Sequence, residues 1–303
     1  MAMPQSLAEW ILYFFLYSFI GWLMETVLCS VRERRFINRG FLNGPLCPIY
    51  GCGVLLILYC LLPVRDAISN LSAALPVVFA AGAGLASAVE FLTSWLMEKL
   101  FHARWWDYSS HRYNLGGRIC LSISLAWGGL ATGIVYILHP ILAECIGRLA
   151  AWNDRLPVYL AAGGGVLFLV DCVVSVQIAR TLGNKLEQLE ELGKLIKAHA
   201  EGLGLPSAED LELKLAAAYD AFESRKKQIA SRFHREDWRA LPREEAASRL
   251  RRAIDELQDR RDSLLLSVKS GHKRLLRAFP TMKREGDNTP LEDLKNRLRR
   301  HKP

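Results

Sequence analysis

The chain has 303 residues, of which 51% are hydrophobic, and a formal net charge of +8. Residues 1–182 contain only 12 of the 39 basic and 10 of the 31 acidic residues, and residues 183–303 contain the remaining 27 and 21. This uneven distribution argues against a single soluble globular domain. It predicts an apolar membrane region that is followed by a charged, solvated region. Because acidic residues are interspersed among the basic ones, we expect contact with a membrane surface and no nucleic acid partner.

Five apolar segments in the first part are long enough to cross a bilayer as helices, which takes roughly 20 residues each. They are approximately residues 7–31, 45–64, 71–100, 119–144 and 158–182. The expected fold class is therefore all-α, a polytopic membrane protein with five transmembrane helices in residues 1–182. The loops after the first and third segments are the most basic. The positive-inside rule thus places the N-terminus outside the bacterial cell membrane and residues 183–303 in the cytoplasm.

Several polar residues lie within these segments or at their inner ends, where polar groups are costly. A charge near the bilayer centre costs about 2.5 to 3.5 kcal/mol on insertion scales, so such residues usually face other helices or water. Their neighbours at helical spacing are small, which favours a position between helices. This predicted polar cluster comprises Glu25, Glu90, Arg39, Asn38, Tyr50 and Asp171. Two interpretations stay open: ion pairing that only stabilises packing, or a polar substrate or ion site that opens inward.

The loop after the third segment contains a second set of candidates, which we call the inner-rim motif. It comprises Trp106, Asp107, Asn114 and Arg118. The aromatic residues of the same loop are Trp105, Trp106, Tyr108 and Tyr113. Aromatic rings at this level commonly anchor a protein in the headgroup region, and that is the structural interpretation of these four.

Motifs for catalysis are absent from the sequence. It contains no GxxxxGK[ST] phosphate loop, no HExxH and no GxSxG, and its seven cysteines form no CxxC pair. We therefore expect no enzyme activity, no cofactor and no metal in this chain. One enzymatic alternative stays open, in which the inner-rim carboxylates act on lipid together with His102 or His111 as acid and base.

The charged region from residue 183 onward shows helical periodicity. Apolar residues recur at Leu186, Leu189, Leu192 and Leu195, a second helix is expected to begin near Ser207, and a third follows Pro242. These pieces predict a helical hairpin or short coiled coil. It either packs on itself, or dimerises or docks a helical partner. The basic amphipathic RLLRAF, residues 274–279, is expected to lie against the anionic inner leaflet.

Several ordered motifs together resemble the bacterial ABC-transporter permease family labelled CmpB, or type IV. They are GWLMET at 21–26, NRGFLNGPLCPIYGCG at 38–53, EFLTSWLMEKLFHARWWDYS at 90–109, NLGGRICLSISLAWG at 114–128 and RLLRAFPTMK at 274–283. The resemblance implies a membrane transport subunit that works with a separate ATPase, since this chain has no nucleotide-binding motif. A membrane-anchored scaffold or sensor acting through its helical tail is the alternative.

Overall fold

The computed structural model describes residues 4, 6–101, 103–202, 243–284 and 288–300. The chain divides into two compact units. The first, here the membrane unit, comprises Met1–Arg180 and Gly271–Glu285; the second, here the tail unit, comprises Thr181–Ser270 and Gly286–Pro303. The helix expected to begin near Ser207 lies outside the described residues.

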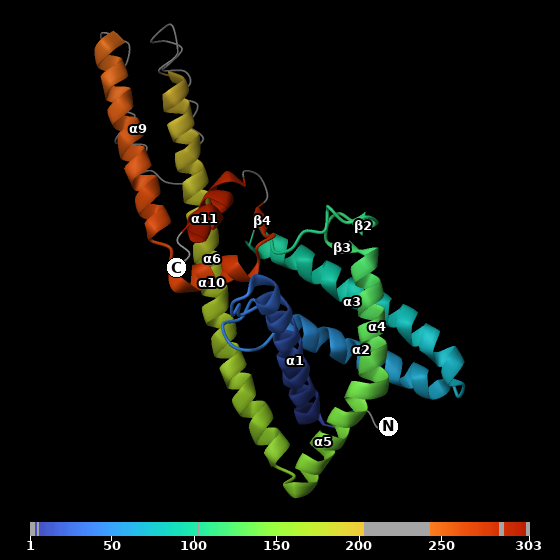
Figure 1. Ribbon diagram of the computed structural model, residues 1–303. Coiled ribbons are helices and arrows are strands. Elements are labelled where there is room, and N and C mark those ends of the chain that lie inside the picture. The colour runs from blue at the N-terminus through green and yellow to red at the C-terminus, as the bar shows by residue number, and fades with distance from the viewer. Residues whose placement is uncertain (1–3, 5, 102, 203–242, 285–287, 301–303) are drawn as a thin grey trace. The chain divides into compact units, whose positions relative to one another are not determined.

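The described residues contain five helices or helical runs that are long and apolar enough to cross a membrane, which confirms the five-span prediction. They are α1 (Leu7–Glu33), α2 (Pro48–Ala67), α3 (Leu71–Phe101), the run from α4 (Leu121–Gly133) through the π-helical η1 (Ile134–Leu138) to α5 (His139–Trp152), and α6 (Leu156–Gly202) (Figure 1). Large apolar side chains such as Val166 and Leu167 on α6 are 62% and 73% exposed, as expected of surfaces that face lipid.

Local chemistry explains where several of these helices begin, end or change geometry. The Ser6 side chain accepts a hydrogen bond from the Glu9 amide at 3.2 Å and caps the start of α1. After the last helical residue, Glu33, Arg34 caps the other end in the left-handed conformation with φ 52°. Pro48 lies in the first turn of α2, where a helix leaves amides unpaired in any case. The π-helical turn η1 precedes the first turn of α5, in which Pro140 has no amide to donate to the preceding turn.

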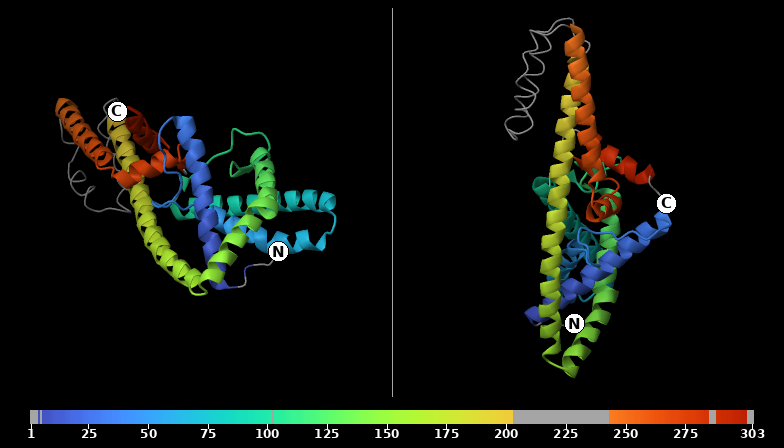
Figure 2. Two further views of the ribbon diagram at one scale, coloured as in Figure 1. Left: turned by 60° about the horizontal axis from the view of Figure 1, so that its bottom comes forward. Right: turned by 90° about the vertical axis from the view of Figure 1, so that its left-hand side faces the viewer.

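The core of the membrane unit forms where α1 packs on α2, α2 on α3, and α3 on α4. Figures 1 and 2 both show α2 and α3 side by side as an antiparallel pair. Small residues allow the close approach: a Cβ added at Gly51 of α2 would lie 2.3 Å from Ser18 Oγ of α1, and one at Gly82 of α3 would lie 2.5 Å from the Ala131 Cβ of α4. The fully buried core side chains include Tyr17, Leu58 and Leu62.

A late segment of the chain belongs to the membrane unit, and we call residues 271–284 the returning segment. Most of α10 (Ser270–Ala278) lies in it, followed by β4 (Lys283–Arg284), which pairs antiparallel with β1 (Ala103–Arg104). A second ribbon pairs β2 (Asn114–Leu115) with β3 (Ile119–Cys120). Leu275 and Leu276 are 0% and 3% exposed. The apolar face of RLLRAF is therefore buried in protein, where the sequence suggested contact with lipid.

The tail unit contains the part of α6 beyond Arg180, α9 (Arg243–Leu266) and α11 (Thr289–Arg300). The predicted leucine stripe on α6 is buried by the chain itself, with Leu186, Leu189, Leu192 and Leu195 each 2% or 3% exposed. Lys185 donates from Nζ to the Ser267 carbonyl oxygen at 2.6 Å, and Arg297 pairs with Asp262 at 2.7 Å. These contacts favour self-packing of the tail helices.

Candidate functional site

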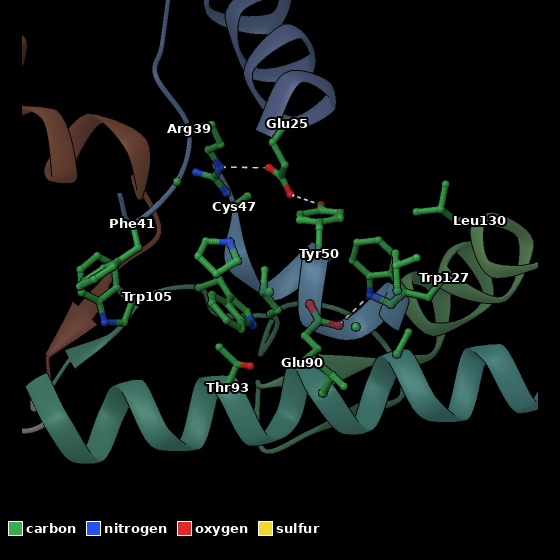
Figure 3. A pocket seen from close by; sticks show the side chains of 18 of the residues that line it. Glu25, Arg39, Phe41, Cys47, Tyr50, Glu90, Thr93, Trp105, Trp127 and Leu130 are labelled. Carbon is green, nitrogen blue, oxygen red and sulfur yellow. Dashed lines mark hydrogen bonds and ion pairs between the residues drawn. The ribbon is translucent and has the colours of Figure 1, made fainter. Parts of the chain in front are cut away.

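The membrane unit contains a partly open pocket of about 280 Å³. Residues of α1 to α4, η1, the loops after α1 and α3, and the returning segment form its wall (Figure 3). Most of the lining side chains are apolar or aromatic. The polar ones are Glu25, Arg39, Tyr50, Glu90, Thr93 and Tyr108, together with the indole of Trp127. Four members of the predicted polar cluster, Glu25, Arg39, Tyr50 and Glu90, thus line one cavity.

Glu25 of α1 is a paired carboxylate. Arg39 donates from Nε to Glu25 Oε2 at 3.1 Å, and the Tyr50 hydroxyl donates to Oε1 at 2.7 Å. The side chains of Arg39 and Glu25 are 22% and 29% exposed. The opposite charges of these two residues cancel inside the pocket.

Glu90 of α3 has a different environment. It is 6% exposed, and it accepts hydrogen bonds from the Tyr108 hydroxyl at 3.0 Å and from Trp127 Nε1 at 2.9 Å. Burial, and next the charge of Glu90, raise the pKa of Tyr108, so its hydroxyl stays protonated and donates. In the described part of the chain, no basic side chain lies within ion-pair distance of Glu90. This carboxylate is therefore held by neutral donors alone.

Two aromatic rings connect these carboxylates. Tyr50 and Trp127 pack edge to face with ring centroids 5.6 Å apart, so that one ring reaches Glu25 and the other Glu90 (Figure 3). Gly21 makes room for this arrangement, because a Cβ there would lie 2.2 Å from Tyr50 Cγ. The small face of α1 predicted from the sequence thus accommodates a pocket residue of α2.

The returning segment completes the wall with Phe279. Its ring packs edge to face on Trp105 at 4.8 Å between centroids, and the Arg39 guanidinium lies 5.1 Å from its centroid. Arg274 holds the segment in place, donating to the carbonyl oxygens of Gly40 at 3.0 Å and Phe41 at 2.8 Å. Burial lowers the pKa of Arg274, and the charge of Asp171 opposes that shift.

The other two members of the predicted cluster lie outside the pocket wall. Asp171 accepts hydrogen bonds from the amides of Asn43 at 3.0 Å and Gly44 at 2.7 Å, and from the side chains of Asn43 and Ser175, each at 3.1 Å. Asn38 accepts from Trp22 Nε1 at 2.6 Å and donates to the Asn43 carbonyl oxygen at 2.7 Å. Both residues therefore fix the loop between α1 and α2.

The inner-rim motif organises the loop after α3. Trp106 lines the pocket and donates from Nε1 to the Arg118 carbonyl oxygen at 3.1 Å. Asn114 accepts from the Gly117 amide at 3.0 Å and donates to the His111 carbonyl oxygen at 2.7 Å, and the Arg118 side chain pairs with Glu98. These contacts hold the loop beneath the pocket.

Asp107 links the same loop to the returning segment. It accepts from the Ser109 amide at 3.0 Å and lies 2.5 Å from Lys283 Nζ. Burial acts to raise the pKa of Asp107, but the hydrogen bonds from Lys283 and Ser109 together outweigh it and lower the pKa.

A protein-family model, described as "Putative ABC-transporter type IV", matches residues 12–176, about half of the chain. The chain belongs to this CmpB family. No curated protein and no solved structure matches it. The matched CmpB range contains Glu25, Arg39, Tyr50, Glu90 and Trp127, whereas the returning segment lies beyond it.

Sequence reasoning missed several residues of this CmpB pocket. Trp105 and Tyr108 suggested headgroup anchors, yet Trp105 is 3% exposed and Tyr108 donates to Glu90, while Tyr113 alone of that set is largely exposed, at 77%. Trp127 and Phe279 were part of quoted motifs without a role. The role of Trp127 could have been predicted from its indole N–H. A buried carboxylate such as Glu90 requires hydrogen-bond donors, and Trp127 is a donor within an apolar segment.

Of the two histidines invoked for lipid chemistry, the structure describes only His111. His111 is exposed, with its ring 5.5 Å from that of Tyr108, and it is absent from the pocket wall. His102 lies outside the described residues.

Proposed function

We propose that this protein is a permease-like subunit of a membrane transport system and that its cargo occupies the pocket between Glu25 and Glu90. Membership of the CmpB family and the five apolar helices support a transport role. The observation that carries the proposal is the buried carboxylate of Glu90, which faces a cavity inside the membrane unit without a basic partner among the described residues. Ionisable groups at such positions commonly mark a substrate or ion pathway.

The proposal includes a topology and an energy source. The five helices cross a bacterial cell membrane, the N-terminus lies outside, and the tail unit lies in the cytoplasm, in agreement with the basic loops after α1 and α3. A separate ATPase subunit supplies the energy, since the sequence has no phosphate-binding loop of its own.

Purification in mild detergent tests the partner. We expect a P-loop ATPase to co-purify at fixed stoichiometry with the chain, and an unrelated five-span protein purified in parallel shows the background. Recovery of the chain alone would count against an ABC-type system.

A substitution pair then tests the pocket. Glu90→Gln keeps an acceptor for Trp127 but removes the charge, whereas Glu144→Gln makes the same change at an exposed residue of α5. We expect the first variant to reach the membrane at the normal level, retain the ATPase and lose transport-coupled ATP hydrolysis. The second is expected to behave like the parent protein. Equal loss of protein and activity in Glu90→Gln would instead indicate a structural carboxylate.

A membrane-anchored scaffold or sensor is the second candidate, and the separate buried core of the tail unit favours it. Arg252 and Arg260 of α9 are exposed, whereas Leu257 of the same helix is buried. If the tail recruits a partner, Arg252→Glu with Arg260→Glu should abolish partner recovery while Glu90→Gln leaves it intact. Unchanged recovery with the α9 variant would argue against this face as the docking surface.

A further inference from the structure

The charge of the pocket is unbalanced. Among the described residues, three acidic or basic side chains line it: Glu25 and Arg39, which pair at 3.1 Å, and Glu90, which accepts hydrogen bonds from Tyr108 and Trp127. Since the charges of Glu25 and Arg39 cancel, the pocket carries one negative charge when Glu90 is ionised. A buried charge without a counterion is costly, so the arrangement is complementary to a single positive charge on an occupant.

The surfaces around that charge are aromatic. Tyr50, Trp105, Trp106, Tyr108, Trp127, Phe41 and Phe279 all line the cavity. The faces of such rings carry negative electrostatic potential and attract cations, and groups of them bind quaternary ammonium ions. The Arg39 guanidinium beside Phe279 is an example of this contact within the pocket.

The lining also argues against other classes of occupant. A bare divalent cation such as Ca²⁺ requires about 6 to 8 oxygen ligands, whereas most of this wall is carbon. An anion would be repelled by the ionised Glu90, and a neutral apolar molecule would leave that carboxylate buried without a counterion. The volume of about 280 Å³ is near the lower end of the range for ligand pockets, roughly 300 to 1,000 Å³, and suits a molecule of one or two rings.

We propose that the pocket binds a monovalent organic cation with an apolar or aromatic body, whose positive group lies beside Glu90 among the aromatic rings. This assignment of a substrate class rests on the proposed transport function. Glu90 supplies the charge, the rings of Trp127 and Tyr50 contact the apolar body, and the pairing of Glu25 with Arg39 keeps the net charge at that of one carboxylate.

Binding of matched probes to the full-length protein in lipid nanodiscs tests the proposal. Benzyltrimethylammonium is the cationic probe, benzylsulfonate carries the same ring with the opposite charge, and tetramethylammonium lacks the ring. Titration calorimetry gives the dissociation constants. We expect saturable binding of benzyltrimethylammonium, at least about 10-fold tighter than that of either control. It alone has both a positive charge for Glu90 and a ring that can pack on the aromatic side chains. Absence of saturable binding, or equal binding of benzylsulfonate, overturns the proposal.

Variants locate the binding and separate it from misfolding. Glu90→Gln should weaken benzyltrimethylammonium binding by about 10-fold or more, and Glu144→Gln should leave it unchanged. Arg39→Gln should strengthen binding, because it leaves the Glu25 carboxylate without its counterion. A misfolded protein does not gain affinity for the probe. Tighter binding by Arg39→Gln together with weaker binding by Glu90→Gln therefore distinguishes a charge effect from misfolding. Equal affinities for the parent and Glu90→Gln proteins overturn the assignment.

The same variants distinguish failure of this inference from failure of the transport function. If the cation fails to bind while Glu90→Gln abolishes transport-coupled ATP hydrolysis, the substrate class is wrong and the pocket remains the transport site. If the cation binds through Glu90 but coupled hydrolysis is unaffected by Glu90→Gln, the binding site is correct and the proposed transport route is wrong.

Discussion

Glu90 on α3 and Asp171 on α6 are both carboxylates within long apolar helices, and the sequence presents them as equals. The structure gives them different surroundings. Asp171 accepts hydrogen bonds from two backbone amides and two side chains, and so joins α6 to the loop between α1 and α2. Glu90 accepts from two side chains that line a cavity. The comparison teaches that the kind of donor, and the presence of space beside it, separates a structural carboxylate from a candidate binding residue.

The largest effect on stability is expected at the structural carboxylate. Asp171→Asn replaces one oxygen with an NH2 group that cannot accept from the Gly44 amide, and it removes the charge that strengthens the remaining bonds. We expect a loss of about 2 to 4 kcal/mol in the free energy of unfolding, because hydrogen bonds to charged groups contribute about 1.5 to 3 kcal/mol each. Thermal or denaturant unfolding in detergent measures it.

Glu90→Gln is the matched control for this loss. It should cost less than about 1 kcal/mol, because a glutamine oxygen still accepts from Trp127 and its NH2 can donate to the Tyr108 hydroxyl. Similar losses in the two variants would erase the proposed difference between the two carboxylates.

The pocket beside Glu90 depends on the position of the Tyr50 ring. Gly21→Ala would place a methyl group against the Tyr50 ring, and overpacking of this kind costs about 1 to 3 kcal/mol. We expect lower stability together with loss of cation binding, since the pocket wall moves. Gly84→Ala on α3 is the control, because nothing lies within 4 Å of an added Cβ there. Gly84→Ala should raise stability slightly, because alanine has the higher helix propensity. Similar changes in stability for the two variants would contradict the steric role of Gly21.

A smaller effect is expected where the returning segment is fastened. Arg274→Gln removes the bonds to Gly40 and Phe41, which should free Phe279 and expose Cys47 in the pocket. Burial raises the pKa of Cys47 to about 12, so alkylation of its thiol is slow in the parent protein. We expect the maleimide reaction at Cys47, followed by peptide mass spectrometry, to accelerate several-fold in Arg274→Gln. Arg277→Gln, at an exposed position of α10, should leave the rate unchanged; acceleration in both variants would point to general loosening.

The smallest effect concerns pH at Asp107, a carboxylate that resembles Asp171 in its use of backbone and side-chain donors. Its pKa is lowered in the folded protein, so its contribution to stability is complete above the ordinary aspartate pKa of about 4. The contribution is lost as the pH falls through the lowered value. We expect less than about 1 kcal/mol, because Lys283 is 57% exposed and solvent screens the pair.

Unfolding of the parent and Asp107→Asn proteins across this pH range measures the contribution. The difference between them should be constant near neutral pH and vanish in acid. If the stability difference between the two proteins grew as the pH fell, it would contradict the lowered pKa of Asp107.

Hydropathy and charge were sufficient to predict the five spans, because length and apolar character are local properties of the chain. The small neighbours at helical spacing also predicted that Glu25 and Glu90 lie between helices, and the sequence assigned Tyr50 and Arg39 to the same polar cluster. The roles of Asp171 and Phe279 were not predictable in this way. Asp171 bonds mainly to a loop 127 or 128 positions away, and Phe279, which packs on Trp105, follows residues 181–270 of the tail unit in the sequence. Such contacts leave no periodicity in the sequence.

The returning segment also orders events during synthesis. All of α1 to α6 up to Arg180 is made before Gly271 leaves the ribosome, so the pocket carboxylates enter the membrane while the place of Phe279 is empty. Closure of the pocket by Phe279 is then a late step, because it must wait for the synthesis of residues 181–270. A chain that ends anywhere between residues 181 and 270 retains the helical residues up to Arg180 but lacks Phe279 and cannot close the pocket. Removal of the tail therefore alters the pocket as well as the tail.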